Sequence, residues 1–307
     1  MACNTPRVMG PRVVILAGGS GKRLVPLTRA LYGVDLPKQF AILEGDKSLL
    51  QTTIERALAL TEASRVSVIV SAAHENHARP QLAPYGDVEL IVQPKGLDTG
   101  PGIMMPLARV LVRDPDSRMV FLPSDHHVEN SEPLTRALRE SEQVADRVAL
   151  LGVTATAPET EYGWIVPGAR VPGTPAYEVS EFVEKPDAVL AEALWHEGGL
   201  WNTFITAGPA RLFWQLASEY LPEHAAWLEA YGHAVGSAHE TRMLERAYHE
   251  MTRASFSRDV LQHCDGLAVI PVEGSGWSDW GSPQRVFASL AGTQSHRALV
   301  ERIHTSS

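Results

Sequence analysis

A short apolar stretch that ends in glycines constrains the fold of this 307-residue chain more than any other feature. Residues 13–17 are enough for one buried β-strand. The glycines that follow allow positive backbone φ angles and leave their N–H groups uncovered. Beside cations, such groups suit a polyanion such as a triphosphate. The glycines and cations of this stretch are Gly18, Gly19, Gly21, Lys22, Arg23, Arg29 and Lys38.

Two common phosphate-binding motifs do not fit this stretch. A P-loop requires glycine, four residues, and then Gly-Lys-Ser/Thr, but its first position here is Leu16 and its last is Arg23. The dinucleotide fingerprint Gly-x-Gly-x-x-Gly requires a third glycine where this chain has Leu24. The remaining interpretations are a different phosphate loop or a glycine-rich turn on the surface.

The first half of the chain alternates between strand-like and helix-like segments. We expect strands at 12–17, 66–70, 88–92, 119–122 and 148–153, and helices at 48–60, 101–112 and 133–146. This alternation predicts an α/β fold with a mainly parallel sheet and helices on both faces. Ligands in such sheets lie beyond the carboxyl ends of the strands. The glycine loop and the segment Pro123-Ser124-Asp125-His126 both follow strands, so both should open onto one crevice.

The second half mixes strands and helices less regularly. Strands are expected at 162–167, 177–184 and 267–272, and helices at 188–197, 281–290 and 298–303. A long helical stretch, 209–249, should break near Leu221-Pro222 and near Gly232.

Composition narrows the class of protein. A net charge of −9 argues against a general nucleic-acid binder, because there is no broad basic surface. Cys3 and Cys264 do not form a disulfide framework and suggest free thiols in a reducing compartment. No apolar run approaches the roughly 20 residues of a membrane span, and residues 1–12 lack a signal-peptide core. We therefore expect a cytoplasmic protein that does not bind a membrane.

Two carboxylates far apart in the sequence are candidate metal ligands. Asp125 follows an expected strand, and Asp279 lies in the tight turn Trp277-Ser278-Asp279-Trp280-Gly281. Mg²⁺ usually takes one or two protein carboxylates and completes its shell with water and substrate phosphates. Taken singly, each aspartate is more simply a turn or capping residue.

The glycine segment resembles the signature of a known enzyme family. It reads Gly-Gly-x-Gly-x-Arg-Leu-x-Pro-Leu-Thr and is followed by Pro37-Lys38-Gln39-Phe40. This resembles the sugar-1-phosphate nucleotidylyltransferases, and in particular their mannose-1-phosphate guanylyltransferase branch. Further motifs occur in the family's order between Val13 and Phe287, namely those around Asp125, Glu184-Lys185, Asn202 and Asp279.

The resemblance implies a Rossmann-like mixed, mainly parallel sheet with helices on both faces, plus a smaller sugar-binding and C-terminal portion. Residues 1–155 would form the nucleotide-binding half and residues 156–307 the sugar-phosphate-binding half of one integrated catalytic unit. The implied reaction is NTP plus sugar 1-phosphate giving NDP-sugar plus pyrophosphate. The sugar-phosphate oxygen attacks the α-phosphorus and is already ionised, so catalysis rests on alignment and charge neutralisation.

The resemblance also implies site residues, by position. The catalytic set is Arg23, Lys38, Asp125 and Asp279, and the last two would hold Mg²⁺. The nucleotide would contact Leu16, Gly18, Gly19, Gly21, Gln93, Thr99 and Gly100. The sugar phosphate would contact Tyr162, Gly163, Glu184, Lys185 and Asn202.

Three departures from the family pattern concern the substrates. Glu161 replaces the first glycine of Gly-Tyr-Gly-Tyr-Ile, Phe204 replaces the glycine of Leu-Trp-Asn-Ser-Gly, and Leu97 replaces an arginine at the base site. The favoured substrates are GTP and mannose 1-phosphate. Glucose 1-phosphate with dTTP or UTP stays open, as does a non-catalytic sensor of NDP-sugars. The oligomeric state is also open, with a homodimer as one option.

Overall fold

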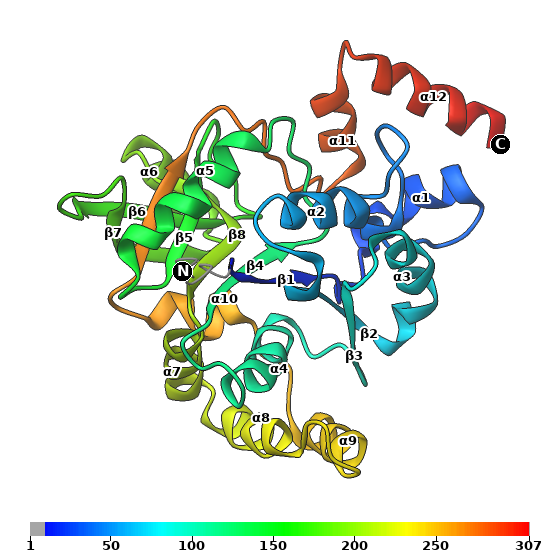
Figure 1. Cartoon of the computed structure of the whole chain (residues 1–307). Coiled ribbons are helices and arrows are strands. Elements are labelled where there is room, and N and C mark those ends of the chain that lie inside the picture. Colours follow the sequence, from blue (N-terminus) through cyan, green and yellow to red (C-terminus); the bar gives the residue numbers. More distant parts are fainter. Residues whose placement is uncertain (1–9, 307) are drawn as a thin grey trace, which may run out of the picture.

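Nine strands form one twisted sheet in a computed structural model that describes residues 10–306 (Figure 1). Their order across the sheet is β3-β2-β1-β4-β8-β5-β9-β7-β6. Cys3 and nearly all of the N-terminal segment considered above lie outside the described residues. The strands are β1 Arg12–Leu16, β2 Val66–Ser71, β3 Glu89–Gln93, β4 Arg118–Pro123, β5 Ala149–Thr154, β6 Gly163–Arg170, β7 Tyr177–Glu184, β8 Leu200–Pro209 and β9 Ala268–Val272.

The first four strands are parallel and the rest of the sheet is mixed. β1 pairs in parallel with β2 and β4, and β2 pairs in parallel with β3. β8 runs antiparallel between β4 and β5, β5 pairs in parallel with β9, and β7 is antiparallel to β6 and β9. Parallel neighbours need long crossovers, which helices supply here. The predicted mixed, mainly parallel α/β sheet is confirmed.

Helices cover both faces of the sheet (Figure 1). The alternation of side chains along β1 explains why, since Val14 packs into one apolar core and Val13 and Ile15 into the other. The first core includes residues of α4 Thr99–Leu111, α7 Ala210–Tyr220, α8 Pro222–Ala234, α9 Glu240–Glu250 and α10 Phe256–Asp259. The second includes residues of α2 Leu49–Leu58, α3 Glu75–Leu82 and α5 Glu132–Glu140.

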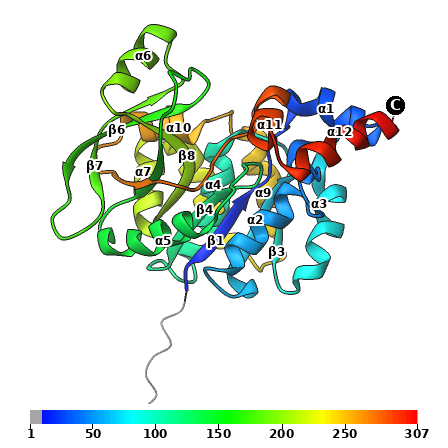
Figure 2. The same ribbon diagram turned by 90° about the horizontal axis from the view of Figure 1, so that it is seen from above.

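The C-terminal helices pack against the first α-helix of the chain. α11 Pro283–Leu290 and α12 Gln294–Ser306 lie beside α1 Val25–Tyr32 (Figure 2). Leu27 and Leu31 of α1 share a third apolar cluster with Val286, Leu290 and Leu299. This contact places the turn before α11 next to the segment that follows the glycine loop. A further helix, α6 Ala188–His196, lies at the opposite end of the molecule.

Several expected elements need correction. The stretch 209–249 contains three helices, and the second break falls at 235–239 rather than at Gly232. Gly232 lies inside α8, and a Cβ there would lie 2.8 Å from the carbonyl oxygen of Ala108, so glycine at this position permits close packing of α8 on α4. The sequence reading assigned no strand to β8, and it gave α5 six residues too many. No helix among residues 10–306 combines the length and apolar character needed to cross a membrane.

Candidate active site

A cleft of about 810 Å³ opens where β1 and β4 end. Residues from both halves of the chain line it, as expected for a crevice beyond the carboxyl ends of parallel strands. Gly100 is the one predicted site residue outside this lining. Its N–H donates to the carbonyl oxygen of Ala254 at 2.8 Å, so it anchors the start of α4. The predicted residues that do line the cleft are Leu16, Gly18, Gly19, Gly21, Arg23, Lys38, Gln93, Thr99, Asp125, Tyr162, Gly163, Glu184, Lys185, Asn202 and Asp279.

The glycine loop is held by the segment around Lys38. The side-chain amide of Gln39 donates to the carbonyl oxygens of Ala17 and Gly19, at 3.0 and 2.8 Å. Gly21 has φ 59°, and a Cβ there would lie only 2.7 Å from the backbone nitrogen of Lys38. Glycine is therefore required at position 21 both by its conformation and by this close approach.

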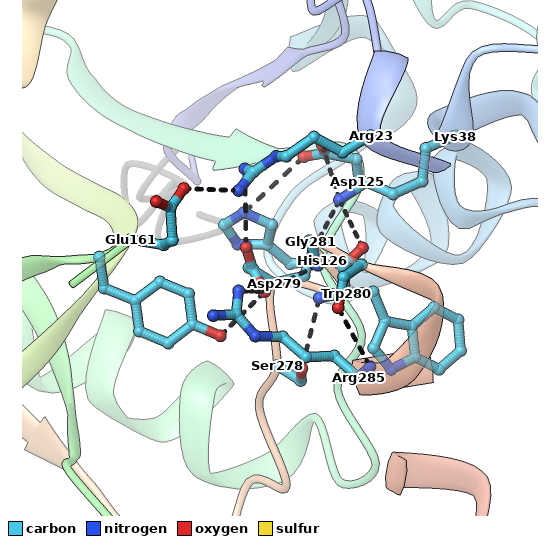
Figure 3. A network of polar contacts seen from close by, with 12 residues as sticks. Arg23, Lys38, Asp125, His126, Glu161, Ser278, Asp279, Trp280, Gly281 and Arg285 are labelled. Atoms are coloured by element: carbon cyan, nitrogen blue, oxygen red, sulfur yellow. Dashed lines mark hydrogen bonds and ion pairs between the residues drawn. The ribbon is translucent and has the colours of Figure 1, made fainter. Parts of the chain in front are cut away.

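Lys38 joins the two acidic motifs (Figure 3). Its side chain is buried, and Nζ donates to the backbone carbonyl oxygen of Asp279 at 2.6 Å. The same Nζ lies 3.1 Å from Oδ2 of Asp125. One ammonium group thus fixes a strand end and a turn that are 154 positions apart in the sequence (279 − 125).

Asp279 is the most heavily bonded carboxylate of the site. Its Oδ1 accepts hydrogen bonds from the hydroxyl of Tyr162 at 2.8 Å, the N–H of Gly281 at 2.8 Å and Nη1 of Arg285 at 3.0 Å. Its Oδ2 lies 3.9 Å from Nη2 of Arg23. A Cβ at position 281 would overlap Oδ2, so this turn admits no side chain there.

Both aspartates are ionised at neutral pH. Burial, the largest influence, raises the pKa of Asp125, but the charge of Lys38 and further favourable contacts outweigh it, so its pKa lies below the usual value. Burial likewise raises the pKa of Asp279, and interactions with His126, Tyr162 and Arg285 bring it below its usual value.

Histidine and tryptophan side chains align the two acidic loops. His127 and Ser278 exchange backbone hydrogen bonds of 2.9 and 3.1 Å, and the ring of His127 stacks on Trp280 with centroids 4.3 Å apart. The indole N–H of Trp277 donates to Nδ1 of His126 at 3.2 Å. Because an indole only donates, the neutral imidazole carries its proton on Nε2, which faces Asp125 at 3.8 Å. Sequence reasoning missed these aligning roles, although both motifs contain the residues.

Arg285 was also missed. It contacts Asp279 and Glu159, and its guanidinium lies over the ring of Tyr162 at 4.7 Å from the centroid. The signal available in the sequence was its place one turn into the helix after the Asp279 motif. Arg285 binds Oδ1 of Asp279, whereas Arg23 faces Oδ2 of the same carboxylate.

The sugar-phosphate candidates gather on β6, β7 and β8. A Cβ at Gly163 would lie 2.9 Å from Oε2 of Glu184 and 3.3 Å from Cβ of Asn202. Glycine at this position therefore allows β6, β7 and β8 to pack closely together. The N–H of Lys185 donates to the carbonyl oxygen of Tyr162 at 3.1 Å. Burial raises the pKa of Glu184.

Strained backbone concentrates at the cleft. Within residues 10–306, four residues other than glycine have positive φ: Asp98, Lys185, Phe204 and Trp280, at 71°, 52°, 60° and 43°. All four line the cleft. Such conformations cost about 1–3 kcal/mol each and cluster at functional sites. Phe204 thus adopts a left-handed backbone at the position where the family pattern has glycine.

The comparisons with known proteins define the family. A family model described as "Nucleotidyl transferase" matches residues 12–295, so the chain belongs to the nucleotidyl transferase family. This confirms the family resemblance of the sequence motifs.

Individual relatives agree with this assignment. The chain is 33% identical over 280 residues to mannose-1-phosphate guanylyltransferase ManC of Salmonella typhimurium, a match that covers 88% of this chain and 57% of that protein. It thus spans little more than half the length of that relative. A crystal structure described as a mannose-1-phosphate geranyltransferase from Thermus thermophilus superposes with a TM-score of 0.81 at 29% identity, covering 92% of this chain and 80% of that one. A putative glucose-1-phosphate thymidylyltransferase from Bacillus anthracis shares the fold, with a TM-score of 0.58 at 17% identity over 90% of this chain and 94% of that one.

Proposed function

We propose that the protein is a nucleotidylyltransferase that converts an NTP and a sugar 1-phosphate into an NDP-sugar and pyrophosphate, with GTP and mannose 1-phosphate as its substrates. The observation that carries this proposal is the convergence of Arg23, Lys38, Asp125 and Asp279 at the mouth of the glycine loop. The family, and relatives named for guanylyl transfer to mannose 1-phosphate, support the choice of substrates.

The nucleotide side of the cleft neutralises phosphate charge. The N–H groups of the Gly18–Gly21 loop and the exposed guanidinium of Arg23 hold the triphosphate and stabilise the departing pyrophosphate. Lys38, fixed by Asp125 and by the Asp279 carbonyl, presents its charge to the α-phosphate from a buried position. Because these cationic groups are already in place, the site does not have to reorganise when negative charge develops on the phosphates during the reaction.

The two aspartates fit a Mg²⁺ site. Each is ionised at neutral pH, and each has one oxygen that lies beyond hydrogen-bond distance of the cationic or imidazole group facing it: Oδ1 of Asp125, 3.8 Å from His126, and Oδ2 of Asp279, 3.9 Å from Arg23. No cluster of three or more such ligands exists in that part of the chain, so substrate phosphates and water would complete the shell. When bound, Mg²⁺ would neutralise phosphate charge and align the two substrates.

The sugar side positions the attacking phosphate. Lys185 is exposed in the cleft at a strained strand end, where its ammonium can contact the phosphate of the sugar. Asn202 is buried between Gly163 and Phe204, and its Oδ1 accepts from the N–H of Phe204 at 3.0 Å. Its amide is thereby oriented for a sugar hydroxyl.

The base side supplies hydrogen-bond donors. Gln93 is buried, and its Oε1 accepts from the hydroxyl of Tyr248 at 2.9 Å, so its NH₂ group is turned toward Gly18. Guanine, uracil and thymine all carry carbonyl oxygens that accept such a bond. We assign guanine from the relatives, and an assay has to distinguish the bases.

The experiment that tests this function is pyrophosphate release across a matrix of four NTPs and several sugar 1-phosphates, with Mg²⁺ present. We expect the highest kcat/KM for GTP with mannose 1-phosphate. Preference for dTTP or UTP with glucose 1-phosphate would keep the reaction and overturn the substrates. Tight binding of GDP-mannose without turnover of any pair would overturn catalysis in favour of a sensor.

A further inference from the structure

A second polar site lies at the other end of β1, away from the cleft. A cavity of about 70 Å³ opens where β1 and β2 begin. A volume of this size holds a few waters or one small oxyanion, and it does not hold a nucleotide. One carboxylate, that of Glu89, lines the cavity. Four arginines also line it, namely Arg12, Arg65, Arg109 and Arg113.

The one lining carboxylate is already committed. Glu89 lies 2.8 Å from Nη2 of Arg109 and accepts a hydrogen bond from Ser67 at 3.1 Å. Arg109 is further paired with Glu240 at 2.7 Å and donates to the hydroxyl of Tyr231 at 2.8 Å. Glu89 is therefore shared between Arg109 and Ser67, and Arg109 draws on a second carboxylate outside the cavity lining, Glu240.

Arg12 and Arg65 are adjacent and poorly paired. β1 and β2 are in register at Val13 and Val66, so the residues before them are neighbours. Arg65 is 7% exposed, its Nη2 donates to Ser117 at 3.3 Å, and its Nε is buried with no hydrogen-bond partner among the described residues. Nε of Arg12 is likewise buried without a hydrogen bond, and its acidic neighbour Asp114 is 3.7 Å away.

Burial, followed by the charge of Arg12, lowers the pKa of Arg65, and the opposite influence of Asp114 and Glu62 does not outweigh them. A buried cation whose counter-charges do not offset its burial is costly, and guanidinium groups bind tetrahedral oxyanions through paired N–H donors.

We propose that this cavity binds a small tetrahedral oxyanion of the phosphate class between Arg12 and Arg65. The anion accepts from guanidinium N–H groups of the two arginines that line the cavity, and it offsets two like charges at the start of adjacent strands. Because β1 leads directly from this cavity to the glycine loop, occupancy stabilises the strand that carries the catalytic loop. The proposal stands apart from the proposed function, since it uses no residue of the cleft.

The test is thermal unfolding titrated with sodium phosphate at constant ionic strength, with chloride as the balancing salt. Phosphate will also enter the cleft, so the background protein carries Arg23→Ala. In that background we expect a saturable rise in Tm, because a ligand of the folded state stabilises it. In Arg12→Gln and Arg65→Met on the same background, the apparent Kd for phosphate should rise at least about tenfold, the scale of losing one charge-assisted contact. Arg136→Gln, an exposed arginine of α5, is the matched control.

The sign of the stability change without phosphate separates this site from a structural role. If Arg65 serves to bind an anion, its buried charge destabilises the protein when no anion is present. Arg65→Met should then unfold at the same temperature as its parent, or higher, in phosphate-free buffer. It should fall below the parent only once phosphate saturates. An equal phosphate response in the parent and both variants would overturn the proposal. If Arg65→Met fails to fold, the partly exposed Arg12→Gln decides the outcome alone.

Discussion

The carboxylate of Glu161 lies 3.1 Å from Nη1 of Arg23, across the mouth of the cleft (Figure 3). The guanidinium proposed to hold the triphosphate is therefore already paired, and its partner stands where the family pattern has glycine. Both side chains are more than half exposed, at 57% and 54%, and exposed pairs of this kind are worth about 0–1 kcal/mol. An incoming triphosphate can displace such a partner at small cost.

Replacing Glu161 with glutamine should strengthen nucleotide binding. We expect KM for the NTP to fall by about two- to fivefold with little change in kcat, because a competing carboxylate is lost and the chemical step is not touched. Initial rates at saturating sugar 1-phosphate measure this. Glu181→Gln removes an exposed acid of β7 and serves as the control for net charge. A rise in KM for the NTP would show that Glu161 contributes to nucleotide binding and does not compete with the NTP for Arg23.

Replacing Asp279 with asparagine should remove most activity. The variant keeps the shape of the side chain but loses a charge at the proposed Mg²⁺ site, so we expect kcat to fall by at least about 100-fold and the Mg²⁺ requirement to rise. Stopped-time pyrophosphate assays over a Mg²⁺ titration measure both effects. Chelation of the wild-type protein should abolish turnover reversibly. A variant with normal rate and normal Mg²⁺ response would exclude Asp279 from the site.

The lowered pKa values of Asp125 and Asp279 predict that the fold loses stability as the pH falls below the usual pKa of aspartate. A carboxylate whose pKa is lower in the folded state stabilises the protein above its unfolded pKa, near 3.9 for aspartate, and this contribution is lost as pH falls through the folded pKa. The Tm of wild-type protein should thus fall more steeply below about pH 4 than that of Asp279→Asn. Calorimetry between pH 6 and 2.5 tests this. Parallel curves would mean that the folded-state pKa is not lowered.

Gly281→Ala should impair catalysis more than folding. The added Cβ would overlap Oδ2 of Asp279 and push aside the carboxylate that Tyr162 and Arg285 hold. We expect kcat to drop by about 10- to 100-fold, since small displacements of catalytic groups have effects of this size. Gly274→Ala is a suitable control, because its Cβ meets nothing and only backbone strain is added. Equal losses of kcat in both variants would contradict the role of Gly281.

The sequence predicted the alternating half of this fold well and the mixed half less well. β1 to β4 alternate with helices in a simple pattern, whereas β8 is inserted between β4 and β5 and pairs with segments before it in the chain. Local periodicity carries no information on such long-range pairing. The convergence of Asp125 and Asp279 followed only from the family resemblance. Its physical cause, the backbone bridge between His127 and Ser278, joins loops that no local rule connects.

The substitutions in the family pattern show another limit of sequence reasoning. Phe204 stands where the family pattern has glycine and has a left-handed backbone, a conformation that the residue type alone argues against. Glu161 replaces another glycine and forms a contact with Arg23 that depends on how two distant strand ends face each other. Neither result follows from residue preferences.

The bond from Lys38 to the carbonyl of Asp279 also bears on how the protein is made. It joins residues 241 positions apart, and the lysine is buried in the finished molecule. During synthesis the glycine loop and its ammonium group leave the ribosome long before their partner exists. The proposed reaction centre can therefore form only late in synthesis, and an unfinished chain that stops before the Trp277 turn contains the glycine loop and Lys38 but lacks the carbonyl group that fixes the lysine.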